Sequence, residues 1–302
     1  MIKFTTRPDI GEVSGDSQEY MNVQYSEAAD ISSSKLFRNI KGIIFDFDGT
    51  LFDNANIPFY LISAYPPDIL RIWKERLVRK QFEGCDYSTP DEYYKNFFIT
   101  LGKACRRSPE RMRAWYFNRF IPRMIRMLQN HYKPRYGVIE MFKRINSLSG
   151  ARKKGIAAHS LNDPADFPKI AVYSDYPFLK ERMEALGINP GSSVLLYTPE
   201  SFGAQKPAVR PFRCIAGDIG FSPEEVLVIG DREDTDGLGA FRAGMRFFCL
   251  KTGRKRYFKL DPYRSPPMKG EEPQGPSLIM YSGTWEELIK LVIEKFSSKN
   301  QP

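Results

Sequence analysis

Five short apolar runs, separated by helical or polar stretches, constrain the fold of this chain more than any other feature. Runs of this length that are rich in Val, Ile and Phe are typical of strands buried on both faces of a parallel sheet. Because helical patterns alternate with them from residue 134 onward, they predict an α/β fold with a doubly wound (Rossmann-like) parallel sheet. The runs are residues 42–46, 169–174, 193–197, 226–230 and 246–250.

The first run ends in two carboxylates, Asp46 and Asp48, which are followed by Gly49 and Thr50. In open α/β sheets, ligands bind just beyond the carboxyl ends of the strands. Two acids at positions i and i+2 can project toward the same side of an extended chain, so both can face one ligand. Close carboxylates repel each other. Either a bound divalent cation or a division of labour into nucleophile and acid would relieve that repulsion.

Polar residues also follow three of the other runs. Ser174 ends the second run, Lys206 lies after the third, and Asp231, Asp234 and Asp236 come directly after the fourth. Each is weak evidence alone, because a Ser or Asp after a strand is more often a helix cap and a Lys is usually solvated. Their joint occurrence at equivalent positions predicts one polar site at the carboxyl edge of the sheet.

The chain divides by pattern into a core and two additions. Residues 1–38 are polar and lack sustained periodicity, so we expect an N-terminal extension. Residues 39–53 and 134–302 are expected to form the α/β core, in which 252–276, rich in Pro, Lys and Gly, form a loop insertion. Residues 54–133 look helical and are too long for a simple connection. We therefore expect a separate α-helical cap domain, inserted over the carboxyl edge of the sheet.

Helix start signals support this interpretation of the inserted segment. Pro66-Pro67-Asp68, Thr89-Pro90-Asp91-Glu92 and Ser108-Pro109-Glu110 each precede a helical pattern. A Ser or Thr cap followed by Pro is the usual beginning of a helix. Pro122 should kink or divide the last of these helices. Near the end of the chain, Thr284 and Glu287 form a capping box that opens a final helix.

Composition excludes several classes of protein. With only two His, histidine-rich metal sites and Ser-His-Asp triads are poor hypotheses, and four scattered Cys argue against a zinc site or a disulfide framework. The chain lacks a bilayer-length apolar stretch and the apolar core of a secretory signal, which predicts a cytoplasmic protein. Residues 54–136 hold 16 basic and 7 acidic residues, a difference equal to the whole net charge of +9. Such asymmetry can attract an anionic substrate, whereas no nucleic-acid motif accompanies it.

Taken together, the four polar clusters resemble the motifs of the haloacid dehalogenase superfamily. They match as DxDGT at 46–50, a strand-ending Ser174, Lys206 before a proline, and GDRxDTD at 230–236. The resemblance covers about residues 40–300. The insertion at 54–133 is similar to the helical cap of the phosphoglycolate-phosphatase-like branch.

This resemblance implies a role for each cluster. Asp46 would be the nucleophile that forms an aspartyl-phosphate, and Asp48 the general acid and base. Gly49, Ser174 and Lys206 would bind the substrate phosphate, with Gly49 letting the backbone pass close to it.

The resemblance also implies Mg²⁺, which prefers oxygen ligands and keeps several waters. Asp46, the backbone carbonyl of Asp48 and Asp231 would hold the ion, and Asp236 would act through water. Family members that cleave carbon–halogen bonds generally lack the second acid. Asp48 therefore favours a phosphomonoester hydrolase acting on a small phosphorylated metabolite. A phosphomutase on a sugar phosphate and a non-catalytic phosphate-binding regulatory protein are the alternatives.

Overall fold

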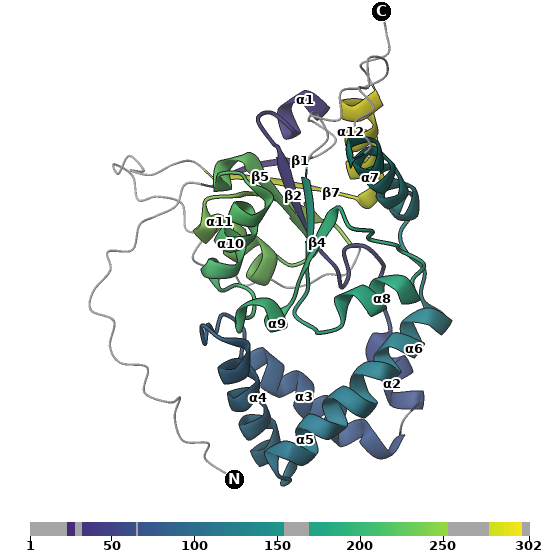
Figure 1. Ribbon diagram of the computed structural model, residues 1–302, viewed down its shortest axis with the longest axis vertical. Helices are drawn as coiled ribbons and strands as arrows, with labels where there is room; N and C mark the ends of the chain where they lie inside the picture. Colours follow the sequence, from purple (N-terminus) through teal and green to yellow (C-terminus); the bar gives the residue numbers. More distant parts are fainter. Residues whose placement is uncertain (1–22, 28–31, 65, 154–168, 253–277, 298–302) are drawn as a thin grey trace, which may run out of the picture.

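The computed structural model describes residues 23–27, 32–64, 66–153, 169–252 and 278–297. Its centre is a seven-stranded sheet in the order β1-β7-β6-β5-β2-β3-β4, and all neighbouring strands are parallel (Figure 1). The strands are β1 (Val23–Glu27), β2 (Gly42–Asp46), β3 (Lys169–Tyr173), β4 (Val194–Tyr197), β5 (Val226–Gly230), β6 (Arg246–Leu250) and β7 (Leu278–Gly283).

The winding of the sheet creates a natural ligand site beside β2. The chain passes outward from β2 to β3 and β4, and then returns to the other side of β2 to form β5 and β6. In such doubly wound sheets the crevice lies where the strand order reverses, beyond the carboxyl ends of the strands. Here that point falls between Asp46, the last residue of β2, and Asp231, which follows β5. The predicted fold class is confirmed.

Helices cover both faces of the sheet because alternate residues of each strand point to opposite sides. In β2, Ile43 and Phe45 join one buried cluster and Ile44 joins the other. Residues of α1 (Ser33–Leu36), α7 (Val138–Lys153), α8 (Leu179–Ala185) and α12 (Trp285–Ser297) pack in the first cluster. Residues of α10 (Val209–Ile219) and α11 (Leu238–Ala243) pack in the second.

Between β2 and α7 the chain forms a set of helices that lies below the sheet in Figure 1. We call this set the helical insertion. The N-caps expected from sequence are present, since the Thr89 and Ser108 side chains accept from the N–H groups of Glu92 and Arg111. Its elements are α2 (Ile57–Ala64), a 3₁₀ turn at Pro66–Asp68, α3 (Ile69–Gln81), α4 (Pro90–Cys105), α5 (Pro109–Trp115), a π-helical turn at Tyr116–Phe120, and α6 (Ile121–His131).

Pro122 divides the last helix of the insertion, as the sequence predicts. The π-helical turn at Tyr116–Phe120 separates α5 from α6, and Pro122 lies in the first turn of α6. Proline has no N–H to donate, and its ring clashes with the carbonyl four residues earlier. A wider turn just before Pro122 accommodates both effects, which explains why the division falls here.

Two chain segments, one around Phe52 and one around Pro134, connect the insertion to the core, and they pair with each other. Phe52 and Pro134 form an isolated antiparallel bridge, and the Arg135 N–H donates to the Leu51 carbonyl at 2.9 Å. A second set of backbone bonds joins the insertion to the loop before α10. There the Gly84 N–H donates to the Lys206 carbonyl at 3.0 Å, and the Gln205 N–H to the Cys85 carbonyl at 3.1 Å. The insertion is therefore bonded directly to the loop that carries Lys206.

The structure differs from the sequence expectations at the edges of the core. The expected N-terminal extension contributes β1 and α1. The sequence pattern also predicts a helix at about 137–148, and α7 continues to Lys153, five residues beyond that end. β7 was also not predicted. β1 is an edge strand that pairs with β7 alone, whereas β7 pairs with both β1 and β6. The polar, Gly-, Ala- and Lys-rich composition of 149–168 predicts a loop there, in addition to the loop insertion expected at 252–276. These two segments fall largely on residues 154–168 and 253–277, outside the described part of the chain.

Candidate active site

Three buried carboxylates and one buried ammonium group meet at the carboxyl edge of the sheet. The Lys206 ammonium donates to Asp46 Oδ1 at 2.6 Å and to Asp236 Oδ1 at 2.8 Å. Asp231, directly after β5, completes the cluster, because one carboxylate oxygen each of Asp46, Asp231 and Asp236 lie within 4.8 Å of one another. All four residues are more than nine-tenths buried, and they come from the ends of β2 and β5 and from the loop before α10.

Two glycines allow this close approach. A Cβ atom added to Gly49 would overlap Asp231 Oδ2, and one added to Gly230 would overlap the Asp236 side chain. Gly49 also has a φ of 100°, which disfavours residues with a side chain. The glycine of DxDGT therefore has a structural reason in this chain, namely the contact between the loop after β2 and Asp231.

Burial controls the electrostatics of the cluster. It raises the pKa of Asp46 to about 6, since Lys206 opposes the increase only in part while Asp236 and Asp48 add to it. It raises the pKa of Asp236 to about 6 as well, again against the opposing effect of Lys206. Burial alone would lower the pKa of Lys206, but the surrounding acids outweigh it and hold that pKa above its usual value. Lys206 is thus a permanent cation among acids that one positive charge does not neutralise.

The composition of this cluster fits a divalent cation. Three carboxylates face a single Lys206 charge, so their full ionisation leaves an excess of negative charge in a buried volume. Hard cations such as Mg²⁺ prefer carboxylate oxygens and need few protein ligands, since they keep water in the remaining positions. The described residues therefore provide the charge and the donor type that a bound Mg²⁺ needs.

Asp48 belongs to a second polar group beside the first. Its Oδ2 accepts a hydrogen bond from the Ser174 hydroxyl at 2.9 Å, and its Oδ1 forms an ion pair with the Arg182 guanidinium. Arg182 also donates to Ser174 Oγ at 2.8 Å. Asp48 thus points toward the end of β3, whereas Asp46 points toward Lys206 and the end of β5.

Local bonds hold the loop that carries both acids. The Thr50 hydroxyl donates to Asp46 Oδ2 at 2.8 Å, so both oxygens of Asp46 are oriented. The Arg135 guanidinium donates to the carbonyls of Gly49 and Thr50 at 2.9 and 3.0 Å. Arg135 lies in the segment where the chain returns from the insertion to the core. The geometry of the loop therefore depends on where the insertion leaves the sheet.

The structure brings all seven residues singled out from the sequence to one edge of the sheet: Asp46, Asp48, Gly49, Ser174, Lys206, Asp231 and Asp236. It adds Arg182, which sequence reasoning missed. Arg182 lies three residues after Leu179 and next to Met183, both buried residues of α8. A charged residue on the apolar face of a short helix was the available signal.

A further buried ion pair joins the insertion to this edge. Arg79 in α3 pairs with Glu75 at 2.6 Å and donates to the carbonyl of Asp175, the residue after Ser174, at 2.7 Å. It also donates to the Tyr116 hydroxyl at 2.6 Å and lies over the Tyr176 ring, 4.0 Å from its centroid. We call Glu75, Arg79, Tyr116 and Asp175 the seam.

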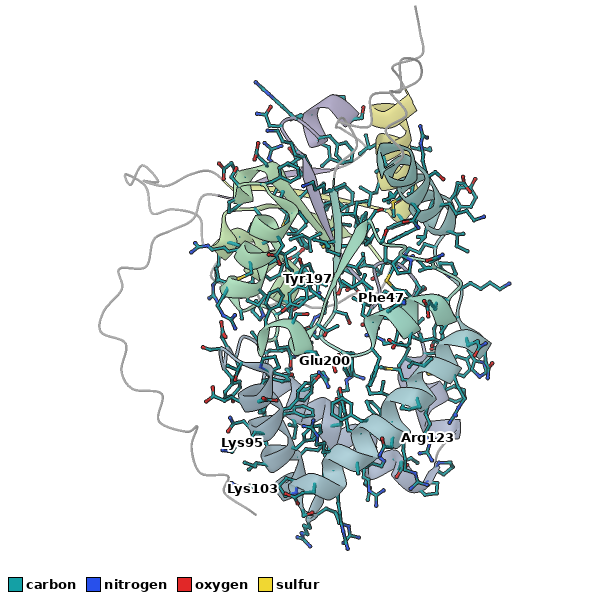
Figure 2. All side chains as sticks on the ribbon, in the orientation of Figure 1. Phe47, Lys95, Lys103, Arg123, Tyr197 and Glu200 are labelled. Atoms are coloured by element: carbon teal, nitrogen blue, oxygen red, sulfur yellow. The ribbon has the colours of Figure 1, made fainter. Side chains whose placement is uncertain are left out.

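The side chains drawn in Figure 2 show how the charge of the insertion is distributed. Lys95, Lys103 and Arg123 lie on the insertion, away from Phe47 and Tyr197 near the strand ends. Arg123 forms an ion pair with the buried Asp68 inside the insertion. Part of the basic excess predicted to attract substrate therefore has a structural partner.

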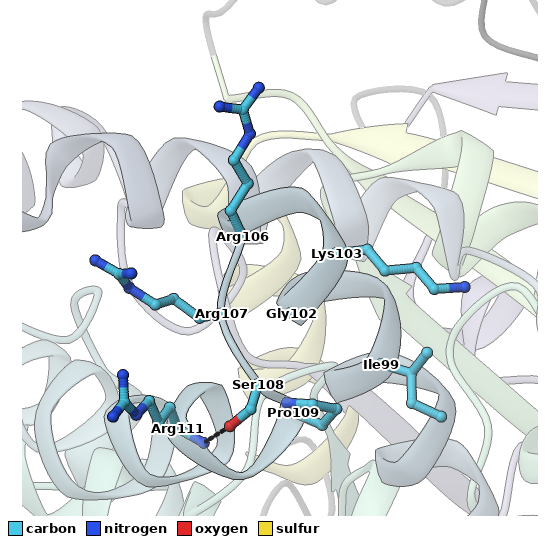
Figure 3. A pocket seen from close by; sticks show the side chains of 8 residues that line it. All are labelled: Ile99, Gly102, Lys103, Arg106, Arg107, Ser108, Pro109 and Arg111. Carbon is cyan, nitrogen blue, oxygen red and sulfur yellow. Dashed lines mark hydrogen bonds between the residues drawn. The ribbon is translucent and has the colours of Figure 1, made fainter.

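A basic cavity of about 510 Å³ opens on the insertion, remote from the buried acids. It lies at the turn between α4 and α5, lined among others by Lys103, Arg106, Arg107 and Arg111 (Figure 3). In that view Arg107 and Arg111 point to one side of the turn and Lys103 to the other. This cavity contains none of the residues of the carboxylate cluster.

Among the described residues, no helix has both the length and the apolar character needed to cross a membrane.

Comparison with known proteins identifies the family. The model of the haloacid dehalogenase-like hydrolases matches residues 40–244, more than half of the chain. The chain belongs to this family. The matched range contains all seven site residues of this hydrolase and the whole helical insertion. A search of curated proteins found no match.

Several solved structures resemble this hydrolase in fold. A predicted phosphoglycolate phosphatase from Haemophilus somnus 129PT is 19% identical, with a TM-score of 0.43, over 84% of this chain and 98% of that one. A 2-haloacid dehalogenase from Pseudomonas syringae pv. tomato DC3000 is 15% identical, with a TM-score of 0.48, over 84% and 99%. A HAD phosphatase from Thermococcus onnurineus is 14% identical, with a TM-score of 0.40, over 84% and 98%.

Proposed function

We propose that this hydrolase is a Mg²⁺-dependent phosphatase that cleaves a phosphomonoester of a small metabolite. The observation that carries the proposal is the second acid, Asp48, two residues after Asp46 and on the same loop. An alcohol leaving from phosphorus needs a proton, whereas a halide leaving from carbon does not. A carboxyl group beside the nucleophile is therefore useful for ester cleavage and superfluous for dehalogenation.

In this proposal Asp46 attacks phosphorus and forms an aspartyl-phosphate. The bond from phosphorus to the ester oxygen breaks, and Asp48 donates its proton to that oxygen. Asp48 then takes a proton from the water that hydrolyses the intermediate, which releases phosphate and restores Asp46. The two hydrogen bonds to Asp46, from Lys206 and Thr50, support this role because they fix the direction of the attacking carboxylate.

Fixed donors would stabilise the phosphoryl group during transfer. Lys206 supplies a buried positive charge, Ser174 a hydroxyl, and the backbone at Gly49 a close approach without a side chain. Preorganised donors of this kind act on charge that develops in the transition state. Asp46, the carbonyl of Asp48 and Asp231 would hold Mg²⁺, with Asp236 acting through water. The ion would reduce the repulsion between an anionic phosphate and an anionic nucleophile.

The test is hydrolysis of a panel of phosphorylated metabolites, with and without Mg²⁺, by the wild-type protein and by Asp46→Asn. We expect Mg²⁺-dependent release of inorganic phosphate, and loss of activity by several orders of magnitude in the variant, since a nucleophile is removed. The melting temperature of Asp46→Asn in Mg²⁺-free buffer should be unchanged or higher, because burial disfavours the ionised Asp46. Asp218→Asn, which changes an exposed acid on α10, is the control.

Three other results would contradict the proposal. Conversion of one sugar phosphate into its isomer, without release of phosphate, would identify a phosphomutase. Binding of phosphate without turnover of any ester would identify a regulatory protein. Release of chloride from a 2-chloroacid, without cleavage of phosphate esters, would identify a dehalogenase.

A further inference from the structure

Arg182 is the most deeply buried charged group next to the proposed catalytic residues, and the mechanism above gives it no role. Its side chain is 0% exposed, and Asp48 is the acid with which it pairs. Burying a guanidinium costs several kcal/mol unless the surroundings compensate for it. A chain that keeps such a group beside its site gains either stability or function from it.

The contacts of Arg182 form a closed group with Asp48 and Ser174. One guanidinium nitrogen, Nη2, donates to Asp48 Oδ1, and the other, Nη1, donates to Ser174 Oγ at 2.8 Å. The Ser174 hydroxyl donates its only proton to Asp48 Oδ2 at 2.9 Å. Both oxygens of Asp48 therefore accept from a donor, and one of these donors, Ser174, is a group that the proposed mechanism needs for the phosphoryl group. The Ser174 proton is directed at Asp48 instead of at a substrate.

Arg182 is fixed in place independently of Asp48. Nη1 also donates to the Tyr176 carbonyl at 3.3 Å, and the guanidinium lies over the Phe47 ring at 4.7 Å and the Tyr176 ring at 5.5 Å. Its Nε has no hydrogen-bond partner among the described residues. Asp48, in contrast, has a side chain that is 23% exposed. Asp48 can therefore leave this group while Arg182 and Ser174 stay where they are.

A phosphoryl group matches the donors that Asp48 occupies. A guanidinium N–H donates a charge-assisted hydrogen bond to an oxygen of a carboxylate or to an oxygen of a phosphate, as Arg182 Nη2 does to Asp48 Oδ1. A serine hydroxyl can rotate its proton from one acceptor to the other. We propose that Arg182 and Ser174 form an anion-binding pair that Asp48 occupies here and that a phosphoryl oxygen of the substrate takes over.

This proposal rests on the proposed function and extends it with a further phosphate-binding residue. As a consequence, the arriving phosphoryl group accepts the hydrogen bonds of Arg182 and Ser174 in place of Asp48. An oxygen of Asp48 is thereby released. The released carboxylate can then take up a proton from solvent, and the resulting carboxyl group can face the leaving oxygen. Arrival of the anion and availability of the acid are thereby linked through Arg182.

The test measures binding of inorganic phosphate, in Mg²⁺-containing buffer, by isothermal titration calorimetry. Four proteins form a cycle: wild type, Asp48→Ala, Arg182→Met and the double variant. We expect Asp48→Ala to bind phosphate about tenfold more tightly than wild type, because its competitor is gone. The double variant should bind roughly 10- to 100-fold more weakly than Asp48→Ala, the range for a charge-assisted hydrogen bond. In the Arg182→Met background, removing Asp48 should change phosphate affinity much less than it does in wild type.

The cycle distinguishes competition between Asp48 and phosphate for Arg182 from general electrostatic repulsion between Asp48 and phosphate. Removing any negative charge near the site strengthens anion binding, but that effect is the same with or without Arg182. Lys180→Met, which removes an exposed cation from the same helix α8, is the matched control and should leave phosphate affinity unchanged. If Arg182→Met melts below the assay temperature, Arg182→Lys replaces it, since it keeps the charge and loses the forked donor.

Equal effects of Asp48→Ala in both backgrounds would overturn the proposal, as would unchanged phosphate affinity in a folded Arg182 variant. The assay also distinguishes this failure from failure of the proposed function. An additive cycle in a protein that hydrolyses phosphate esters contradicts the anion-binding pair alone. A coupled cycle in a protein without hydrolysis supports the pair and contradicts the phosphatase.

Discussion

The carboxyl edge of the sheet and the seam with the insertion both bury charged side chains, but they balance charge differently. At the edge, Asp46, Asp231 and Asp236 surround the single cation Lys206. At the seam, Arg79 meets Glu75 one to one, and its other N–H groups donate to the Tyr116 hydroxyl and the Asp175 carbonyl. The edge carries excess negative charge, whereas the charges of Arg79 and Glu75 at the seam balance each other.

This difference separates a site prepared for a ligand from a structural contact. Burial raises the pKa of Asp46 and of Asp236 to about 6. Ionising both groups therefore costs free energy, because the attraction to Lys206 offsets the cost of burial only in part. At the seam, burial also raises the pKa of Glu75, but Glu75 holds the pKa of Arg79 well above its usual range, and the pair remains ionised. We therefore expect changes at the edge to alter function, and changes at the seam to alter stability.

The largest expected effect at the edge is on the leaving group. Asp48→Asn should lower kcat for an alkyl phosphate about 10²–10⁴-fold, because the alcohol must leave without a proton. The loss should be far smaller for p-nitrophenyl phosphate, whose leaving group is stable as an anion. Steady-state kinetics with both esters measures the contrast. Thermal melting should give a lower transition than wild type but a folded protein at the assay temperature, because the variant leaves the buried Arg182 guanidinium without its counter-charge.

A loss of equal size with both esters would contradict the role of Asp48 as the acid. It would show that the substitution disturbs binding or metal loading, steps that the two esters share. Asp234→Asn is the control, because Asp234 lies in the same motif as Asp231 but pairs with Arg232. Its kinetics should stay near those of wild type with both esters.

The edge could be predicted from sequence and the seam could not, for a physical reason. Strand ends are local features, since an apolar run followed by Asp46, Ser174 or Asp231 shows where each carboxyl group or hydroxyl must lie. Parallel pairing then brings these ends together without any further information. The contact between Asp231 and Gly49 can be predicted once the order of the strands is known.

Arg79 and Arg182 do not follow the end of a strand. Each lies within a helix, where an isolated basic residue usually faces solvent. Their burial depends on how the insertion and α8 pack against the loop after β3, which the spacing of residues does not encode. β1 could not be predicted for a similar reason, because its pairing with β7 joins residues more than 250 positions apart along the chain. Prediction from sequence failed where contacts are distant along the chain and the residues have another common use.

At the seam, the expected effect is on stability. Arg79→Met should reduce the free energy of unfolding by about 3–5 kcal/mol, because it leaves Glu75 buried without its cation. Urea denaturation followed by circular dichroism measures this loss. The double variant Glu75→Gln/Arg79→Met should recover part of it, since it removes both charges together. Lys80→Met, at an exposed position of the same helix, should leave stability nearly unchanged. A small loss in Arg79→Met would show that the seam contributes little.

The smallest expected effect tests the charge excess at the edge directly, through the pH dependence of stabilisation by Mg²⁺. Asp46 and Asp236 have a pKa of about 6 in the folded protein against an ordinary value of 3.8. A carboxyl group with a raised folded pKa contributes stability that is fully present below pH 3.8 and is lost as the pH rises through 6. Without Mg²⁺, the melting temperature should therefore fall over that window.

Mg²⁺ requires the ionised carboxylates, so its contribution has the opposite pH dependence. A concentration one hundred times Kd should add about 3 kcal/mol above pH 6, and the gain should disappear toward pH 4. Asp231→Asn should abolish the gain, whereas Asp218→Asn, at an exposed acid, should preserve it. A gain that is the same at pH 5 and pH 8 would mean that the ion binds elsewhere, and the contrast between edge and seam would then have no basis in charge.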